Sequence, residues 1–196
     1  MRLGTNIVGF RENPAQIVVG VAVRHPLYQR WRRPNQSALA DLAEALASER
    51  LVEGRSVLAK SRSHSRGVSV AAVSSDTMAV GIDVEWMSPD RRWLDIISMF
   101  APSAPDRSPD MVMLAKAWTF IEAFYKAEQA YPVEADVMEI LHADLPEGTP
   151  ITLLSGASVQ FTMLAGGFPM AVYWTAEGKG AQISYVFAEP ADIEAV

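Results

Sequence analysis

The sequence VGIDVEW places two acidic residues, Asp83 and Glu85, one residue apart. Successive side chains of a β-strand point to opposite faces, so a strand here would project both carboxylates from one face and the apolar residues from the other. Adjacent carboxylates repel each other, and a shared cation relieves that repulsion. Oxygen ligands in twos and threes, completed by water and substrate phosphate, are typical of Mg²⁺ sites. The pair therefore indicates either a magnesium site or an ordinary solvent-exposed face.

A third acid, Glu122, lies in the apolar sequence AWTFIEAFYKA. Trp118, Glu122 and Lys126 follow one another at intervals of four residues, which places Glu122 and Lys126 on nearly one face of a helix. A surface pair of this kind would contribute only about 0.3–0.5 kcal/mol. The surrounding aromatic and aliphatic residues, however, predict a largely buried helix. We therefore expect the charged pair to face a polar cleft.

A histidine between two serines, Ser63-His64-Ser65, precedes the acids, with 19 residues from His64 to Asp83. His64 could donate a hydrogen bond to a phosphate, and the neighbouring hydroxyls would complete a polar edge. A structural role is the alternative for an isolated histidine. The segment is therefore a candidate phosphate-binding element, provided that the fold brings it close to the acids.

The elements that must position these residues follow from apolar spacing along the chain. Helices are predicted at 37–50, 88–100 and 109–130, and the last two begin with the same capping sequence, Ser-Pro-Asp. Strands are predicted at 16–24, 55–62, 66–75, 77–86, 151–154, 158–164, 170–175 and 182–187. Because strands and helices come in clusters rather than in strict alternation, we predict an α+β fold.

The chain of 196 residues, 49% of them hydrophobic, is long enough to bury one sizeable core or two small ones. It contains no cysteine, which excludes disulfides, thiolate metal sites and a cysteine nucleophile and is compatible with a reducing compartment. The apolar run at residues 17–23 is too short to cross a bilayer, and no leader-like segment precedes it. We therefore expect a soluble cytoplasmic protein without a membrane partner.

The net charge of −6 is divided unevenly along the chain. Residues 1–70 hold 11 of the 17 Lys and Arg and 5 of the 23 Asp and Glu, which gives +6, and the remainder of the chain carries −12. A basic first part favours an anionic ligand or partner, unless residues such as Arg30, Arg32 and Arg33 are simply a solvated surface. The negative total argues against a nucleic-acid-binding protein.

Taken together, three motifs resemble those of the 4′-phosphopantetheinyl transferase superfamily: Ser63-His64-Ser65, Gly81-Ile82-Asp83-Val84-Glu85 and Trp118-x-x-x-Glu122-Ala123-x-x-Lys126-Ala127. Their order and spacing match over residues 63–127, with 39 residues from Asp83 to Glu122. The length resembles the surfactin-synthetase-type branch, in which one chain folds as two similar α+β halves around a pseudo-twofold axis. The resemblance thus implies a monomer with an N-terminal half at 1–86 and a C-terminal half at 87–196.

The resemblance also implies an activity, namely the Mg²⁺-dependent transfer of the phosphopantetheine arm of coenzyme A to a serine of an acyl or peptidyl carrier protein, with release of 3′,5′-ADP. By their motif positions, Asp83, Glu85 and Glu122 would hold the metal. Glu122 would also activate the carrier serine. The coenzyme A phosphates would be contacted by Ser63, His64 and Lys126, of which Lys126 also counts as catalytic.

Two departures from the motif keep alternatives open. Ile121 stands where the motif commonly has lysine, which implies reduced activity, a compensating arginine elsewhere or neither. It keeps open a non-catalytic relative that binds coenzyme A or a carrier protein, against which the retained Asp83, Glu85, Glu122 and Lys126 argue. The glycine-rich turn that often follows the helix motif is absent, so carrier docking is expected to differ there. An unrelated metal-dependent phosphohydrolase is a second alternative, although His25, His64 and His142 form no ligand cluster in the sequence. A plain α+β interaction domain, with all its acids on the surface, is a third.

Overall fold

A computed structural model of the chain describes residues 15–24, 36–51, 56–75, 79–104, 110–143, 145–175 and 181–189. Within these residues the elements are β1 (Ala15–Val23), α1 (Gln36–Arg50), β2 (Ala59–Ser65), β3 (Val68–Ser74), β4 (Val80–Val84), α2 (Trp93–Ile97), α3 (Met111–Glu128), α4 (Glu134–His142), β5 (Pro150–Thr152), β6 (Ser158–Leu164), β7 (Phe168–Trp174) and β8 (Ala181–Phe187). The predicted α+β class is confirmed.

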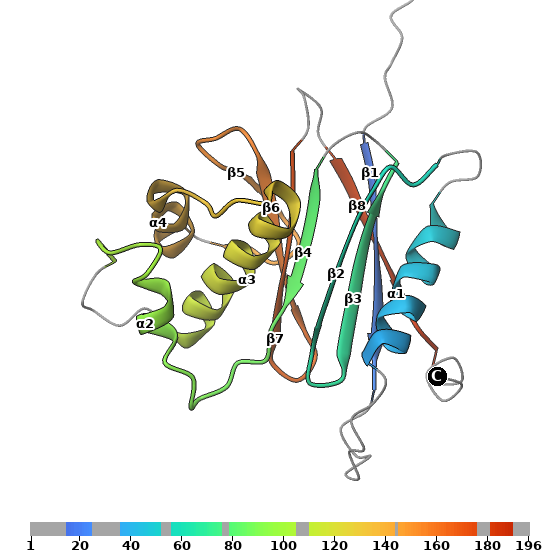
Figure 1. Cartoon of the computed structure of the whole chain (residues 1–196), viewed down its shortest axis with the longest axis horizontal. Helices are drawn as coiled ribbons and strands as arrows, with labels where there is room; N and C mark the ends of the chain where they lie inside the picture. Colours follow the sequence, from blue (N-terminus) through green and yellow to red (C-terminus); the bar gives the residue numbers. More distant parts are fainter. Residues whose placement is uncertain are drawn as a thin grey trace, which may run out of the picture.

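The strands form two four-stranded sheets (Figure 1). The first has the order β2-β3-β1-β8, in which β8 runs parallel to β1 and the other pairs are antiparallel. The second has the order β4-β7-β6-β5, and all of its pairs are antiparallel. β2 and β4 are therefore edge strands. Each sheet also takes one strand from the other side of residue 86, and the division of the chain there stays a prediction.

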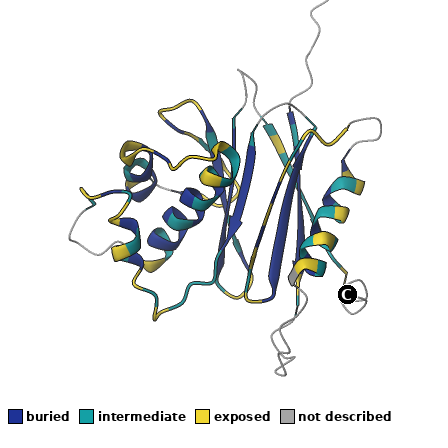
Figure 2. Ribbon diagram, viewed as in Figure 1, coloured by how far each residue is buried: buried dark blue, intermediate teal, exposed yellow. Residues whose placement is uncertain are grey.

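Side chains from both sheets form one inner core, and helices cover the outer faces of the sheets (Figure 1). Alternate residues of β1, such as Ile17 and Val19, point into this inner core together with Ile82 of β4. Val18, between them, packs against α1. α3, with α2 and α4, covers the outer face of the second sheet. Figure 2 shows the consequence, since β3 and β7 are buried along their whole length.

Two strand glycines let a helix approach each sheet closely. A Cβ atom on Gly20 of β1 would lie 1.9 Å from the carbonyl oxygen of Ala43 in α1. A Cβ atom on Gly81 of β4 would lie 1.8 Å from the carbonyl oxygen of Ala123 in α3. Both distances are far inside van der Waals contact, so a larger residue fits only if the helix moves. Gly81 thus sets the distance between β4 and α3, the two elements that carry the acids.

α2 starts later and is shorter than predicted. The segment expected to begin a helix at Ser88 forms a turn, in which Arg91 N and Trp93 Nε1 both donate to Ser88 O. Because these bonds close the chain on itself, the helix begins only at Trp93 and ends at Ile97. The predicted helix at 88–100 was therefore wrong in both boundaries.

α3 follows its predicted range of 109–130 closely. Asp110 caps it, since the Asp110 side chain accepts from Val112 N at 3.2 Å. Gln129 ends it in the left-handed conformation, at a φ of 55°. The expected capping residue Ser108 lies outside the described residues.

α4 was not predicted, although its sequence carries a helical pattern. Val137, Ile140 and Leu141 recur at helical spacing and are buried in the core that α3 also lines. The prediction of strands alone after α3 was therefore wrong for this segment. No described helix is both long enough and apolar enough to span a membrane.

β2 lies further along the chain than the predicted strand at 55–62, so that Ser63 and His64 belong to the strand itself. This shift gives the two residues opposite faces. Five basic residues of the first part of the chain lie outside the described residues: His25, Arg30, Arg32, Arg33 and Arg55.

Candidate functional site

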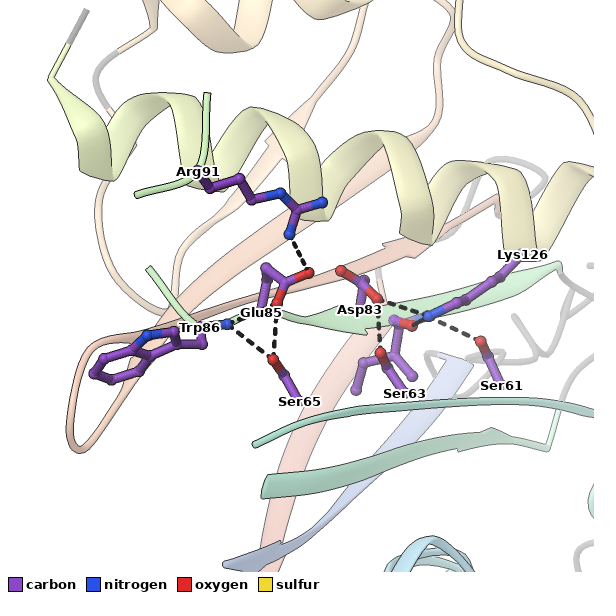
Figure 3. Close-up of polar contacts among 9 residues, drawn as sticks. Ser61, Ser63, Ser65, Asp83, Glu85, Trp86, Arg91 and Lys126 are labelled. Atoms are coloured by element: carbon purple, nitrogen blue, oxygen red, sulfur yellow. Dashed lines mark hydrogen bonds and ion pairs between the residues drawn. The ribbon is translucent and has the colours of Figure 1, made fainter. Parts of the chain in front are cut away.

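β2 and β4 lie side by side where the two sheets meet, and serine side chains join them (Figure 3). Ser61 Oγ accepts from Ile82 N at 3.1 Å, and Ser65 Oγ accepts from Trp86 N at 3.1 Å. Because alternate residues of a strand share a face, Ser63 also points toward β4. The serines thus satisfy backbone donors on an edge strand, where a further strand would otherwise pair.

Asp83 is the most buried of the three acids, with 5% of its surface exposed. Its Oδ1 accepts from Ser63 Oγ at 2.6 Å and from Lys126 Nζ at 2.7 Å. Lys126 Nζ also donates to Ile82 O at 3.1 Å, which fixes the amine against β4. Burial raises the pKa of Asp83, whereas Lys126 and Ser63 act in the opposite direction. Strand β4 and helix α3 are therefore joined by a charged pair.

Glu85, two residues further along the chain, is held by three donors. Its Oε1 accepts from Ser65 Oγ at 2.8 Å and from Trp86 N at 3.0 Å. Its Oε2 accepts from Arg91 Nη1 at 2.7 Å. The predicted shared face of Asp83 and Glu85 agrees with these contacts, because each acid meets a serine from the same face of β2 (Figure 3).

Glu122 lies one helical turn before Lys126 on α3 and is half-buried. Burial raises the pKa of Glu122, and the negative charge of Asp83 raises it further. The positive charges of Lys126 and Arg91 lower it, and the charge of Glu85 raises it again. The three acids thus form one electrostatic cluster with two cations, although they come from separate parts of the sequence.

Arg91 is the site residue that the sequence analysis missed. Its guanidinium carbon lies 4.5 Å from the ring centroid of Trp93 and 5.1 Å from that of Trp118. It is also the cation paired with Glu85. The only sequence signal was an arginine shortly after the acidic strand, because its position depends on how the turn after β4 folds back on α3.

His64 is not brought to the acids. It lies on the outer face of β2, opposite Ser63, and its side chain is exposed. Lys60 and Arg62 share this outer face and form ion pairs with acidic residues of α1. Of the predicted phosphate-contacting residues, Ser63 and Lys126 therefore meet at Asp83, whereas His64 faces the other way.

The oxygen atoms of the three acids suit a hard divalent cation. Within the described part of the chain, the side-chain hydrogen bonds to Asp83 all reach Oδ1, and no hydrogen bond reaches the side-chain carboxylate of Glu122. Glu85 Oε2 accepts from Arg91 and keeps capacity for a second partner. Among the described residues, no group of three or more His, Cys, Asp or Glu side chains is arranged closely enough to hold a metal ion. The donor set fits Mg²⁺, with Lys126 and Arg91 as internal cations that occupy part of its capacity.

The geometry gathers carboxylates, an ammonium group, a guanidinium group and hydroxyls at the junction of two sheets. Such a set can hold a divalent cation next to a phosphoryl group, and a carboxylate with a raised pKa can accept a proton. No family model and no curated protein matches the chain.

Proposed function

We propose that the protein transfers the 4′-phosphopantetheine arm of coenzyme A to a serine of an acyl or peptidyl carrier protein, in a Mg²⁺-dependent reaction that releases 3′,5′-ADP. The observation that carries the proposal is the convergence of Asp83 on β4 with Glu122 and Lys126 on α3. Ser63 on β2 joins them through Asp83. Residues of all three motifs that resemble the transferases thus meet at one place in the fold.

A repeated arrangement supports the expectation of two similar halves around a pseudo-twofold axis. In the first, the chain runs β1-α1-β2-β3 and forms the strand order β2-β3-β1. In the second, it runs from β4 through α3 to β6 and β7 and forms the matching order β6-β7-β4. The close glycine–alanine contact also occurs twice, as Gly20 with Ala43 and Gly81 with Ala123. The repeat supports two halves that divide between β3 and β4, ahead of the expected boundary at residue 86.

In this proposal Asp83, Glu85 and Glu122 hold Mg²⁺, which when bound neutralises charge on the diphosphate oxygens. Lys126 donates to the phosphates. Ser63 and His64 point from opposite faces of β2, so a nucleotide that meets both crosses the edge of that strand. The basic first part of the chain gives such an anion a favourable approach.

Glu122 accepts the proton of the carrier serine hydroxyl, directly or through a water molecule, as the serine oxygen attacks the β-phosphorus. The bond from that phosphorus to the bridging oxygen breaks, and 3′,5′-ADP leaves with the electron pair. In the metal-free protein, burial and the negative charge of Asp83 raise the pKa of Glu122, which favours proton uptake by its carboxylate. Lys126 stabilises the negative charge that develops on the transferred phosphoryl group.

The departure at Ile121 does not favour an inactive relative. Ile121 is fully buried in the core that α3 shares with α4. Arg91 brings a second positive charge to the acids from another segment. The cluster therefore has two cations without a lysine at position 121. The burial of Asp83 also disagrees with an interaction domain whose acids all lie on the surface.

The release of 3′,5′-ADP from coenzyme A, followed by chromatography in the presence of a panel of apo acyl and peptidyl carrier proteins, tests the proposal. Transfer predicts release that requires both Mg²⁺ and a carrier protein. Release without any carrier would support the phosphohydrolase instead. Binding of coenzyme A without release on any carrier would support the inactive relative.

A further inference from the structure

Arg91 lies at the opposite end of the acid cluster from Lys126 (Figure 3). Each cation pairs with a different acid, Lys126 with Asp83 of β4 and Arg91 with Glu85 just after β4, and both N···O distances are 2.7 Å. Both positive charges also lower the pKa of Glu122. Lys126 and Arg91 therefore flank the acids from two sides, and each forms an ion pair with one of them.

The guanidinium group of Arg91 is held in place by more than its ion pair. It stacks over Trp93 and Trp118, which belong to α2 and α3. Trp93 is itself fixed, because its Nε1 donates to Ser88 O at 2.9 Å. The neighbouring Arg92 differs, since its side chain is 84% exposed and, among the described residues, forms an ion pair only with the surface residue Asp95. Arg91 is thus preorganised, whereas Arg92 is an ordinary surface arginine.

We propose that Arg91 is a second substrate-binding cation, which holds Glu85 in the free protein and exchanges it for a phosphate oxygen of coenzyme A when Glu85 turns to a divalent cation. The inference rests on the proposed function, because it names how the same site receives its substrate. The side chain of Arg91 is 30% exposed, so its head can reach an incoming anion. A planar guanidinium with five N–H donors can keep its aromatic contacts while one edge changes partner.

If Arg91 exchanges Glu85 for a phosphate, its removal should affect the binding of a divalent cation and of coenzyme A in opposite directions. Arg91 competes with a divalent cation for Glu85, and it attracts the phosphates of coenzyme A. Loss of Arg91 should therefore strengthen the binding of a divalent cation alone and weaken the binding of coenzyme A alone. A residue that only supports the fold would weaken both.

Calorimetric titrations of Mn²⁺ alone, and of coenzyme A in the presence of EDTA, test this for the wild type and three variants. Arg91→Ala should bind Mn²⁺ several-fold more tightly and coenzyme A about tenfold more weakly, the effect of one charge-assisted hydrogen bond. Arg92→Ala is the matched control and should bind both ligands as the wild type does. If Arg91→Ala behaves like Arg92→Ala, or if it loses affinity for both ligands, the proposal is overturned.

Arg91→Lys separates direct contact from long-range charge and serves also where Arg91→Ala folds poorly. It keeps the positive charge but loses the planar fork, so direct contact predicts coenzyme A binding several-fold weaker than in the wild type. Wild-type affinity for coenzyme A in Arg91→Lys would contradict the proposal. Because the titrations need no transfer, opposite shifts in a protein that modifies no carrier would sink the transferase and leave this inference standing. If the wild type transfers the arm but the Arg91 variants bind both ligands normally, the transferase stands and the proposed role of Arg91 is refuted.

Discussion

Lys126 Nζ lies 2.7 Å from Asp83 Oδ1, so a lysine of helix α3 holds an almost fully buried aspartate of strand β4 across 43 residues of sequence. A buried carboxylate without a partner is strongly unfavourable, and the ammonium group offsets much of that penalty. The same contact places Glu122, one turn earlier on α3, near Asp83 and Glu85. A single ion pair therefore both stabilises the junction and assembles the candidate site.

Asp83→Asn should nearly abolish transfer while the protein stays folded, because the amide keeps the shape of the side chain but loses its charge. We expect the rate to fall by about 10²–10³-fold, as for the loss of one charge-stabilising group. Initial rates of carrier modification, with circular dichroism to establish folding, provide the measurement. Asp95→Asn serves as the control, because it removes an exposed carboxylate whose one ion pair within the described segments is with Arg92. Full turnover by Asp83→Asn would refute the role of Asp83.

Lys126→Ala should weaken coenzyme A binding and also reduce stability. The loss of a charged donor to phosphate is expected to lower the affinity about tenfold. Asp83 then lacks its cation, so the free energy of unfolding should fall by about 1–3 kcal/mol. Calorimetry and urea denaturation measure the two effects, and Lys126→Arg should restore part of both. An unchanged coenzyme A affinity would show that Lys126 is only a structural partner of Asp83.

Glu122→Gln should change the pH dependence of stability in metal-free buffer. The pKa of Glu122 is raised above its ordinary value of 4.5, so between these two pKa values the folded protein binds more protons than the unfolded chain. Stability of the wild type therefore falls as pH rises through that window, and the unfavourable ionisation persists above it. Glu122→Gln has no carboxyl to ionise at this position, so its stability does not fall in this pH window for that reason.

Urea denaturation with EDTA provides the measurement for Glu122. The midpoint of Glu122→Gln should exceed that of the wild type at about pH 8, and the difference should disappear on acidification to about pH 4. A difference that is the same at both pH values would show that the carboxyl of Glu122 has no raised pKa in the fold.

Gly81→Ala and Gly20→Ala form a matched pair, because each glycine faces a carbonyl oxygen of its helix at nearly the same distance. Each should reduce the free energy of unfolding by about 2–3 kcal/mol through overpacking. Under the proposed function, only Gly81→Ala should also reduce transfer per folded molecule, since it displaces α3, with Glu122 and Lys126, from β4. Urea midpoints and rates measured well below them test this. Equal rates for folded Gly81→Ala and wild type would show that the spacing of α3 is not critical.

Local periodicity was enough to predict which acids share a face. The alternation in VGIDVEW places Asp83 beside Glu85, and the four-residue interval places Glu122 beside Lys126. The same alternation determines that Ser63 and His64 point to opposite faces once both belong to one strand. These relationships depend only on the geometry of a single element, which is why the sequence contains them.

Contacts between elements were not accessible in this way. The pairing of Ser61 and Ser65 with the edge of β4 requires that two different sheets meet at these strands. The position of Arg91 requires a turn that folds back on two tryptophans. α4 was overlooked although its apolar spacing is visible, because the segment was short and followed by strand-like sequences.

Intact-mass spectrometry of apo carrier proteins, after incubation with the protein, coenzyme A and Mg²⁺, tests the central claim most directly. A transferase predicts that at least one carrier gains the mass of the phosphopantetheinyl arm, that EDTA prevents the gain, and that Asp83→Asn fails to produce it. A wild type that binds coenzyme A and Mg²⁺ but adds no mass to any acyl or peptidyl carrier would contradict the transfer activity.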